Sequence, residues 1–370
     1  MAFSASRYLV IGAGHGGKAM AAHLALMGCE VTLYNRTPEN VAGIAARGGI
    51  DLESYPNGPR GFGKLQLVTS DLSQALARAE VIMVVTPSSA HRELAEHMAP
   101  YLRDGQIIIL NPGRTCGAIE VAKVLRDVGC QAKVKIAEAG TFVYASRSDG
   151  PAQARIFRIK DAVPLAALPA KDTPEVLEAV REAYPQFIDG GNVLQTSLDN
   201  MGAIFHPALV ILNAGWIEST RGEFQFYIDG VTPSVARVLE VLDRERVTVA
   251  ASLGIRAQTA LEWLKRAYDA TGPTLYEAIQ NQEGYYGIMA PKTLQHRYIF
   301  EDIPMSVVPI AALGAQYGVA VRAMEAIIRL ACIIHQTDYW RRGRTPDKLG
   351  IAHLSVAELT RYVMEGVLEH

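Results

Sequence analysis

A single histidine in the second half of the chain has the surroundings of a proton-transfer group. His206 precedes Pro207 within an apolar stretch that runs from residue 199 to residue 213. Because proline removes a main-chain hydrogen bond, we expect the helix to kink or restart at His206 and to aim the imidazole away from ordinary core packing. Imidazole gains and loses a proton near neutral pH. We therefore interpret His206 as catalytic, with a hydrogen-bonded core histidine as the alternative.

A glycine cluster near the N terminus has the spacing of a dinucleotide-binding turn. An apolar run over residues 8–11 ends at Gly12, and small residues at helical spacing follow the cluster. Gly12 permits the turn, Gly14 lets the backbone approach a pyrophosphate, and Gly17 lets the helix pack closely on the strand. A second strand over residues 29–34 follows at the distance of a βαβ unit. The predicted cofactor loop contains Gly12, Gly14, His15, Gly16 and Gly17.

The residues after the second predicted strand indicate which cofactor binds. NAD-binding versions of this fold close that strand with an acidic residue that accepts hydrogen bonds from the ribose. This chain has Asn35, Arg36 and Thr37 there instead. An arginine can pair with a 2′-phosphate and stack on adenine. We therefore predict NADP(H) in preference to NAD(H); the alternative is that Arg36 only points to solvent.

Polar residues follow three further apolar runs. The runs cover residues 81–85, 107–110 and 133–137, and the first of them lacks polar alternation, as expected for a buried parallel strand. Because ligands of such sheets bind at the carboxyl ends of the strands, we expect some of these polar residues to line the cofactor site and others to be ordinary loops. The cofactor candidates are Thr86, Pro87, Ser88, Asn111 and Gly113.

The length and pattern of the chain predict two domains. Its 370 residues are more than one small domain needs, and the alternation of strands and helices stops near residue 190. We place a dinucleotide-binding domain at residues 1–190 and an all-helical domain at residues 191–367. Residues 368–370 are interpreted as the remnant of an expression tag and are excluded.

Composition argues against several other classes. Lys plus Arg (36) nearly balance Asp plus Glu (38), which gives a net charge of −2 and no reason to expect a nucleic acid or an anionic membrane as a partner. The four cysteines lack metal-ligand or disulfide spacing, so we expect reduced thiols, no metal and a cytoplasmic protein. No apolar run approaches the roughly 20 residues of a membrane span.

A cluster of charged and aromatic residues lies between residues 296 and 304. It contains His, Arg, Tyr, Glu and Asp and ends at a proline. Such clusters are usually solvated loops, and composition alone predicts one here.

Taken together, the chain resembles the octopine/nopaline (opine) dehydrogenases. The resemblance rests on the glycine cluster, on Thr86–Ser88 and Asn111–Gly113, on Asn200–Pro207, and on His296–Tyr298 with Glu301–Pro304. It implies an α/β fold with an N-terminal Rossmann-type doubly wound parallel sheet, followed by an all-α domain like the C-terminal domain of 6-phosphogluconate dehydrogenase. Members of the family reduce the imine formed between an α-keto acid and the amine of an amino acid. The resemblance also implies that His206 is the catalytic histidine and that Asp302 is its carboxylate partner.

Both substrates of such a reaction carry carboxylates, so cations should line their site. Arg297 is the first candidate to bind a carboxylate and Arg114 the second. Glu138 is expected to receive the ammonium of the amino substrate, and Asn200 to orient the substrate or the nicotinamide amide. Apolar segments in the helical domain favour a homodimer.

Two other readings stay open. A 2-keto acid reductase of the ketopantoate or β-hydroxyacid dehydrogenase type would use a catalytic lysine, for which Lys265 and Lys292 are the nearest candidates. A cofactor-binding protein that has lost catalysis is the other. If oxidation of the cofactor requires an amine as well as a keto acid, the enzyme reduces an imine and is not a simple keto acid reductase. Any turnover would exclude a protein that has lost catalysis.

Overall fold

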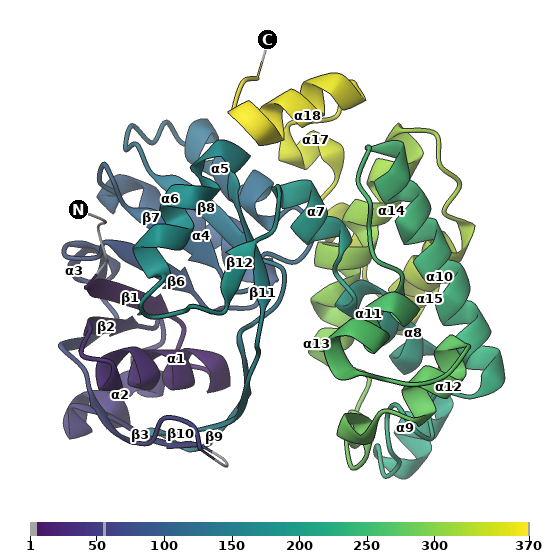
Figure 1. Ribbon diagram of the computed structural model, residues 1–370, viewed down its shortest axis with the longest axis horizontal. Helices are drawn as coiled ribbons and strands as arrows, with labels where there is room; N and C mark the ends of the chain where they lie inside the picture. Colours follow the sequence, from purple (N-terminus) through teal and green to yellow (C-terminus); the bar gives the residue numbers. More distant parts are fainter. Residues whose placement is uncertain (1–5, 55–56, 369–370) are drawn as a thin grey trace. The chain divides into compact units, whose positions relative to one another are not determined.

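The computed structural model describes residues 6–54 and 57–368 and divides the chain into two compact units (Figure 1). The first unit contains the chain up to Thr196 together with the C-terminal segment from Glu358, and the second contains Ser197–Ala357. Sequence reasoning had placed the boundary near residue 190 and had kept the chain in the helical domain to residue 367. The C-terminal segment returns to the first unit because α18 (Val356–Glu365) binds there. The Tyr362 hydroxyl accepts a hydrogen bond of 2.9 Å from Arg126.

The first unit is built on an eight-stranded sheet. Its strands follow the order β12-β11-β8-β7-β6-β1-β2-β5, and neighbouring strands are parallel except for β11, which is antiparallel to β8. Their bounds are β1 Arg7–Ile11, β2 Glu30–Tyr34, β5 Leu67–Thr69, β6 Val81–Val84, β7 Ile107–Leu110, β8 Lys135–Ala139, β11 Val163–Leu168 and β12 Phe187–Asp189. The Rossmann-type parallel sheet predicted from the sequence is confirmed.

A second sheet, which sequence reasoning missed, covers the first helix. It has four strands in the order β4-β3-β10-β9, with bounds β3 Gly49–Ser54, β4 Gly61–Lys64, β9 Tyr144–Gly150 and β10 Gln153–Ile159. Helix α1 (His15–Leu26) contacts strands of both sheets, and its residues Ala19, Ala21 and Ala22 are completely buried. A Cβ atom on Gly63 would come within 2.7 Å of the backbone of Ala22. Small residues therefore line α1 because sheets pack against it from two directions.

The remaining helices of the first unit follow the strands of the large sheet. They are α2 Glu39–Arg47, α3 Leu72–Leu76, α4 His91–Met98, α5 Gly117–Asp127 and α6 Thr173–Val180, and α7 Val193–Leu198 leads into the second unit. Asp71 begins α3 as an N-cap, since its carboxylate accepts hydrogen bonds from the backbone N–H groups of Ser73 and Gln74.

The second unit is helical, as predicted. It contains α8 Gly202–Leu212, α9 Ala214–Thr220, α10 Pro233–Ser252, α11 Ala260–Tyr268, α12 Leu275–Gln280, α13 Arg297–Phe300, a π-helical turn Ile303–Val307, α14 Val308–Gln316, α15 Arg322–Ile334, α16 Tyr339–Arg342 and α17 Pro346–Leu349. Helix α8 continues through Pro207 without a break. The large change of direction, 64°, comes instead at Asn213, where α9 follows.

The central helices of this unit are apolar because they form its core. Contrary to the sequence-based expectation, the stretch Arg297–Gln316 among the described residues is long and apolar enough to cross a membrane, but 78% of its apolar window is buried inside the structure. Helix α8 packs against α10, α13, α15 and the π-helical turn. This packing brings residues near position 206 and residues near position 302 together.

Candidate active site

The glycine cluster forms the tight loop that the sequence predicted. Gly12 has φ of +112°, and a Cβ there would come within 2.4 Å of the Val85 carbonyl oxygen. A Cβ on Gly17 would come within 1.7 Å of the Gly12 carbonyl oxygen, so α1 lies directly against the turn. Gly14 has open space around its Cβ position within the part of the chain that is described. The loop therefore has room for a ligand at the first turn of α1, where backbone N–H groups favour an anion.

Two side chains of the predicted cofactor site hold the loop in place. The Asn35 side-chain oxygen accepts a hydrogen bond of 3.2 Å from the Ala13 N–H, and its amide donates to the Thr37 carbonyl at 3.1 Å. His15 Nδ1 accepts a hydrogen bond of 2.9 Å from the Ser148 N–H. Burial and the nearby cations Arg147 and Lys18 lower the pKa of His15. A neutral imidazole is what this acceptor role requires.

The carboxyl ends of β6 and β7 carry polar atoms that fit an absent ligand. The Thr86 hydroxyl and the Asn111 side-chain oxygen are buried and have no hydrogen-bond partner among the residues described. Ser88 is also buried, whereas Pro87 is exposed. Because buried polar atoms are normally paired, the two unpartnered oxygens fit the carboxamide and hydroxyl groups of a nicotinamide nucleotide. Sequence reasoning placed cofactor-binding residues at these strand ends.

Arg36 does not simply point to solvent. Its Nη1 lies 3.0 Å and 2.9 Å from the two carboxylate oxygens of Glu93, a residue of α4. Both side chains are exposed, at 71% for Arg36 and 53% for Glu93. An exposed ion pair of this kind contributes little stability and exchanges partners easily. Glu93 lies 57 residues away in the chain, and sequence reasoning did not find it.

In the second unit, α8 and the turn before the π-helix bring His206 and Asp302 together. Nδ1 of His206 lies 2.9 Å from Oδ2 of Asp302. The Asp302 side chain is fully buried, and 20% of the His206 side chain is exposed. A carboxylate only accepts hydrogen bonds, so Nδ1 carries the proton and Nε2 is the ring nitrogen left to exchange one. The geometry is that of a histidine oriented by a buried carboxylate.

An aromatic stack holds the imidazole plane. The ring of Tyr298 lies parallel to that of His206, with centroids 4.0 Å apart and planes 17° apart. Phe226 stacks on Tyr298 at 5.5 Å, and His296 meets Tyr298 edge-on at 4.4 Å. Burial, Arg297 and His206 lower the pKa of His296. Sequence reasoning missed this stack, because His206 and Phe226 each lie 70 or more residues before Tyr298 in the chain.

Behind Asp302, a hydrogen-bonded chain extends to Asn200. The Asn200 amide donates to the Ser306 hydroxyl at 3.0 Å, and Ser306 donates to Asp302 Oδ1 at 3.5 Å. Asn200 is 3% exposed. Its amide thus supports the carboxylate within the unit, and the expected contact with a substrate or nicotinamide stays a prediction. The geometry orders Asn200, Ser306 and Asp302 as a buried support for His206.

Arg297 lies beside this pair on α13. Its guanidinium is 52% exposed, and its Nε lies 3.2 Å from a carboxylate oxygen of Glu301, whose side chain is 3% exposed. The buried Asp302 and Glu301 contradict the solvated loop that composition predicted for residues 296–304. His206, far away in the chain, pairs with the buried Asp302, whereas Glu301 pairs with Arg297 in the same cluster.

Glu138, at the carboxyl end of β8, is completely buried. Its two oxygens accept hydrogen bonds of 2.8 Å from the Ala118 N–H and 2.7 Å from the Thr196 hydroxyl. Ala118 is in the first turn of α5, so the carboxylate also faces the positive end of that helix. A Cβ on Gly113 would come within 2.4 Å of Glu138. Glu138 thus joins these elements inside the unit, and its role in receiving a substrate ammonium stays a prediction.

Comparisons with known proteins agree on the family and on the fold. Residues 189–335 match the family model described as NAD/NADP octopine/nopaline dehydrogenase, alpha-helical domain, and residues 8–113 match that described as NAD-dependent glycerol-3-phosphate dehydrogenase N-terminus. The chain is 38% identical to an opine dehydrogenase of Arthrobacter sp. (strain 1C), over 95% of this chain and 96% of that protein.

Two solved structures share the fold. One is an octopine dehydrogenase with NADH and L-arginine, which superimposes with a TM-score of 0.81 at 20% identity and covers 98% of this chain and 99% of that one. The other is a yersinopine dehydrogenase with bound NADP⁺, with a TM-score of 0.73 at 13% identity and 98% coverage of both chains.

Proposed function

Because the chain belongs to the octopine/nopaline dehydrogenase family of NAD(P)-dependent oxidoreductases acting on CH–NH bonds, we propose that it condenses an α-keto acid such as pyruvate with an amino acid. The product is an N-(carboxyalkyl) amino acid. The observation that carries the proposal is the hydrogen bond of 2.9 Å between His206 and the buried Asp302. The bound nicotinamide cofactor supplies the hydride.

In the proposed mechanism, His206 handles the protons. The amine nitrogen adds to the keto carbon, and water leaves once its oxygen has been protonated, which forms the imine. The imine nitrogen takes up a proton, so that hydride addition at the imine carbon would leave a secondary amine with one N–H. Nε2 of His206 donates and accepts these protons, while Asp302 holds Nδ1 protonated and stabilises the imidazolium. Arg297 is the proposed clamp for the keto acid carboxylate, and its half-exposed guanidinium supports that role.

We also propose that NADP(H) is preferred over NAD(H). Arg36 follows β2 in place of the usual acid, and its exposed pair with Glu93 can open to admit a 2′-phosphate. Replacing Arg36 with Asp should invert or abolish the preference, measured as kcat/KM for NADPH and for NADH. An unchanged ratio would refute the assignment.

Oxidation of NADPH with a panel of keto acids, each with and without amino acids, tests the reaction itself. Oxidation that requires both substrates supports imine reduction and begins to identify the amine. Oxidation with a keto acid alone would instead indicate a hydroxyacid dehydrogenase. Lys265 and Lys292, the candidates for the catalytic lysine of such an enzyme, are both exposed. Tight NADPH binding without turnover on any pair would indicate a protein that has lost catalysis.

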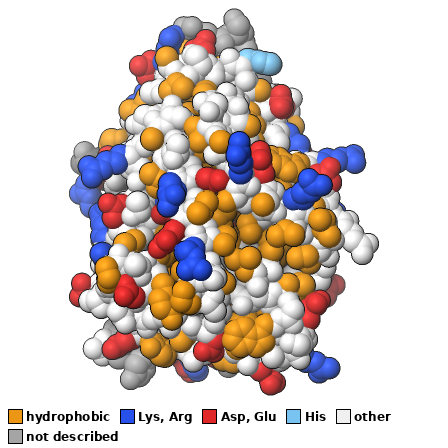
Figure 2. All heavy atoms as spheres, turned by 90° about the vertical axis from the view of Figure 1, so that its right-hand side faces the viewer, with side chains coloured by type: hydrophobic (Ala, Val, Ile, Leu, Met, Phe, Trp, Pro, Cys, Tyr) orange, Lys and Arg blue, Asp and Glu red, His pale blue; other side chains and the backbone are white. Residues whose placement is uncertain are grey.

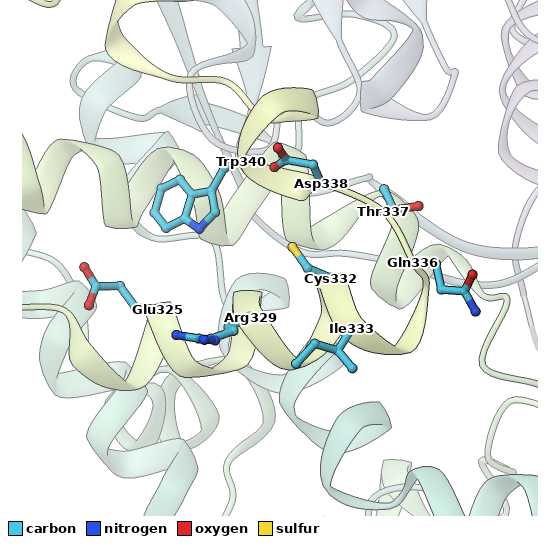
Figure 3. A pocket seen from close by; sticks show the side chains of 8 residues that line it. All are labelled: Glu325, Arg329, Cys332, Ile333, Gln336, Thr337, Asp338 and Trp340. Carbon is cyan, nitrogen blue, oxygen red and sulfur yellow. The ribbon is translucent and has the colours of Figure 1, made fainter.

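We further propose a homodimer that uses the helical unit. Hydrophobic side chains gather on one face of that unit (Figure 2), and on α15 Leu330 is 42% and Ile333 is 65% exposed. Ile333 also lines an open pocket of about 640 Å³ beside α16, with Arg329 and Trp340 (Figure 3). The pocket contains none of the predicted site residues. Sedimentation of the wild type and of Ile333→Glu, with Val128→Glu as an exposed control, tests this; a monomeric wild type would refute it.

A cytoplasmic location is part of the proposal. The four cysteines are free thiols, which is expected in a reducing compartment. Fractionation of cells that express the tagged protein would test it, and recovery outside the cytoplasm would refute it.

A further inference from the structure

A lysine outside the predicted site lies at the same edge of the large sheet as the cofactor-binding strand ends. Lys160 follows β10, and its Nζ donates a hydrogen bond of 2.6 Å to the hydroxyl of Thr141. Its backbone N–H also donates to the Val143 carbonyl at 2.9 Å. Thr141 comes two residues after β8 ends, and β8 runs parallel to β7. The ammonium group is therefore held at the carboxyl edge of the sheet, where ligands of such folds bind.

A second cation shares this edge. Arg114 comes directly after Gly113, whose N–H donates a hydrogen bond of 3.2 Å to the carbonyl of Ala139 at the end of β8. Burial, Arg114 and Arg158 lower the pKa of Lys160 to about 8, so the ammonium is still mainly charged at neutral pH. Arg158 itself pairs with Asp161 at 3.1 Å. The charges that influence Lys160 are thus cations.

No acidic side chain balances Lys160 within the described residues. Its side-chain hydrogen-bond partner is the neutral hydroxyl of Thr141, and the ion pairs among the described residues do not include Lys160. Keeping an ammonium group half-buried among other cations is costly unless an anion joins them. The arrangement therefore indicates an anionic ligand at this point.

The position of Lys160 relative to the strands indicates which anion it binds, a substrate carboxylate or a cofactor phosphate. The glycine loop follows β1, and Arg36 follows β2. The strand order places β6 and β7 between β1 and β8, so the strand that precedes Thr141 is not a neighbour of the strands that precede the glycine loop and Arg36. An anion here is better explained by a substrate carboxylate than by a phosphate.

We propose that Lys160, assisted by Arg114, binds one of the substrate carboxylates of the reductive condensation. This inference rests on the proposed function and adds to it a second carboxylate site. If that carboxylate is the amino acid's, the site favours amines that carry a carboxylate over simple amines.

Lys160→Met tests the proposal by removing the charge and keeping the length of the side chain. Lys133→Met is the matched control, because Lys133 is exposed just before β8 at the opposite edge of the sheet. We expect KM for one substrate to rise about 10- to 100-fold in Lys160→Met, the range that a hydrogen bond to a charged group supplies. KM for NADPH should stay unchanged, and Lys160→Arg should recover most of the loss.

Two further arms identify the carboxylate. If it belongs to the amino acid, wild type and Lys160→Met should use the corresponding amino acid amide equally poorly; if it belongs to the keto acid, KM for pyruvate should rise instead. Thermal shifts by pyruvate and by the preferred amino acid, in the presence of NADP⁺, report binding without turnover.

Three results would overturn the inference. They are unchanged KM values for both substrates, an increase confined to KM for NADPH, and equal effects of the Lys160 and Lys133 variants. If Lys160→Met does not fold, the same measurements on Lys160→Gln decide. A wild type that needs no amine would refute the proposed function instead, and it would do so whatever the Lys160 variants show.

Discussion

Replacing Asp302 with Asn tests the proposed proton-transfer pair most directly. The change keeps the shape of the side chain and alters only the hydrogen-bonding groups. In the wild type, Asp302 accepts from His206 at 2.9 Å and from the Ser306 hydroxyl at 3.5 Å. The Ser306 oxygen already accepts a hydrogen bond of 3.0 Å from Asn200. The Ser306 hydroxyl therefore still needs an acceptor. The new asparagine satisfies it when its side-chain oxygen faces Ser306, and its NH₂ group then faces His206.

That orientation reverses the roles of the imidazole nitrogens. Nδ1 must then accept a hydrogen bond, so the proton moves to Nε2, and Nε2 can no longer act as a base. In the opposite orientation the amide NH₂ faces Ser306, whose own hydroxyl proton loses its acceptor. In both cases the imidazolium loses the buried negative charge that stabilises it. Positioned acid–base groups contribute about 10²–10⁴-fold, and we expect turnover of Asp302→Asn to fall by that factor.

The assay is NADPH oxidation with the preferred keto acid and amino acid, followed from about pH 5.5 to 9 to span the titration of a histidine. His206→Ala should lose a similar factor, and the double variant should lose little more, because the two residues act as a unit. Binding of NADPH should be unchanged. Ser306→Ala is the control for disturbance of the buried chain. Turnover of Asp302→Asn within roughly fivefold of wild type across the pH range, a difference of only about 1 kcal/mol, would refute the reasoning.

Three further predictions follow from contacts near the two sites. Tyr298→Leu should lower kcat about 3- to 10-fold and change its pH profile, because the stack on His206 is lost, whereas Tyr298→Phe should preserve both; equal losses would contradict this. Glu93→Gln should raise kcat/KM for NADPH relative to NADH about fivefold, since one charge about 4 Å away costs about 1 kcal/mol in water. That gain should shrink at high salt, and an unchanged ratio would mean that Glu93 does not oppose Arg36. Glu138→Gln should lower the free energy of unfolding in urea by about 1–3 kcal/mol, because two buried hydrogen bonds depend on the carboxylate; unchanged stability would argue against that structural role.

The dinucleotide loop was predictable because its constraints are local. Position 12 requires a positive φ, and position 17 lies too close to the Gly12 carbonyl oxygen to hold a Cβ atom. Both positions therefore require glycine, and their spacing in the sequence is fixed. The parallel strands were predictable for a similar reason, since burial on both faces removes polar alternation. The second sheet was not, because β3 pairs with β10 about 100 residues later in the chain. Its trace in the sequence is the run of alanines in α1, which only close packing on two sides explains.

The chemistry of the site depended more strongly on distant partners. Composition placed residues 296–304 in solvent, yet Asp302 is buried because His206, 96 residues earlier in the chain, binds it. The pairing of Arg36 with Glu93 and the support of Asp302 by Ser306 are likewise invisible in a local pattern. The resemblance to a family supplied the pairing of His206 with Asp302, which spacing alone did not.

The two halves of the proposed chemistry are built within separate units. His206, Asp302 and Ser306 all belong to Ser197–Ala357, whereas the glycine loop and Arg36 belong to the first unit. Substitutions at His206 or Asp302 should therefore spare cofactor binding, and substitutions at Arg36 should spare the pH profile of turnover. If one substitution abolished both properties, a loss of stability of the whole chain would have to be excluded before the reduced turnover could be assigned to the role of the residue. Thermal melting of each variant must accordingly accompany its kinetics.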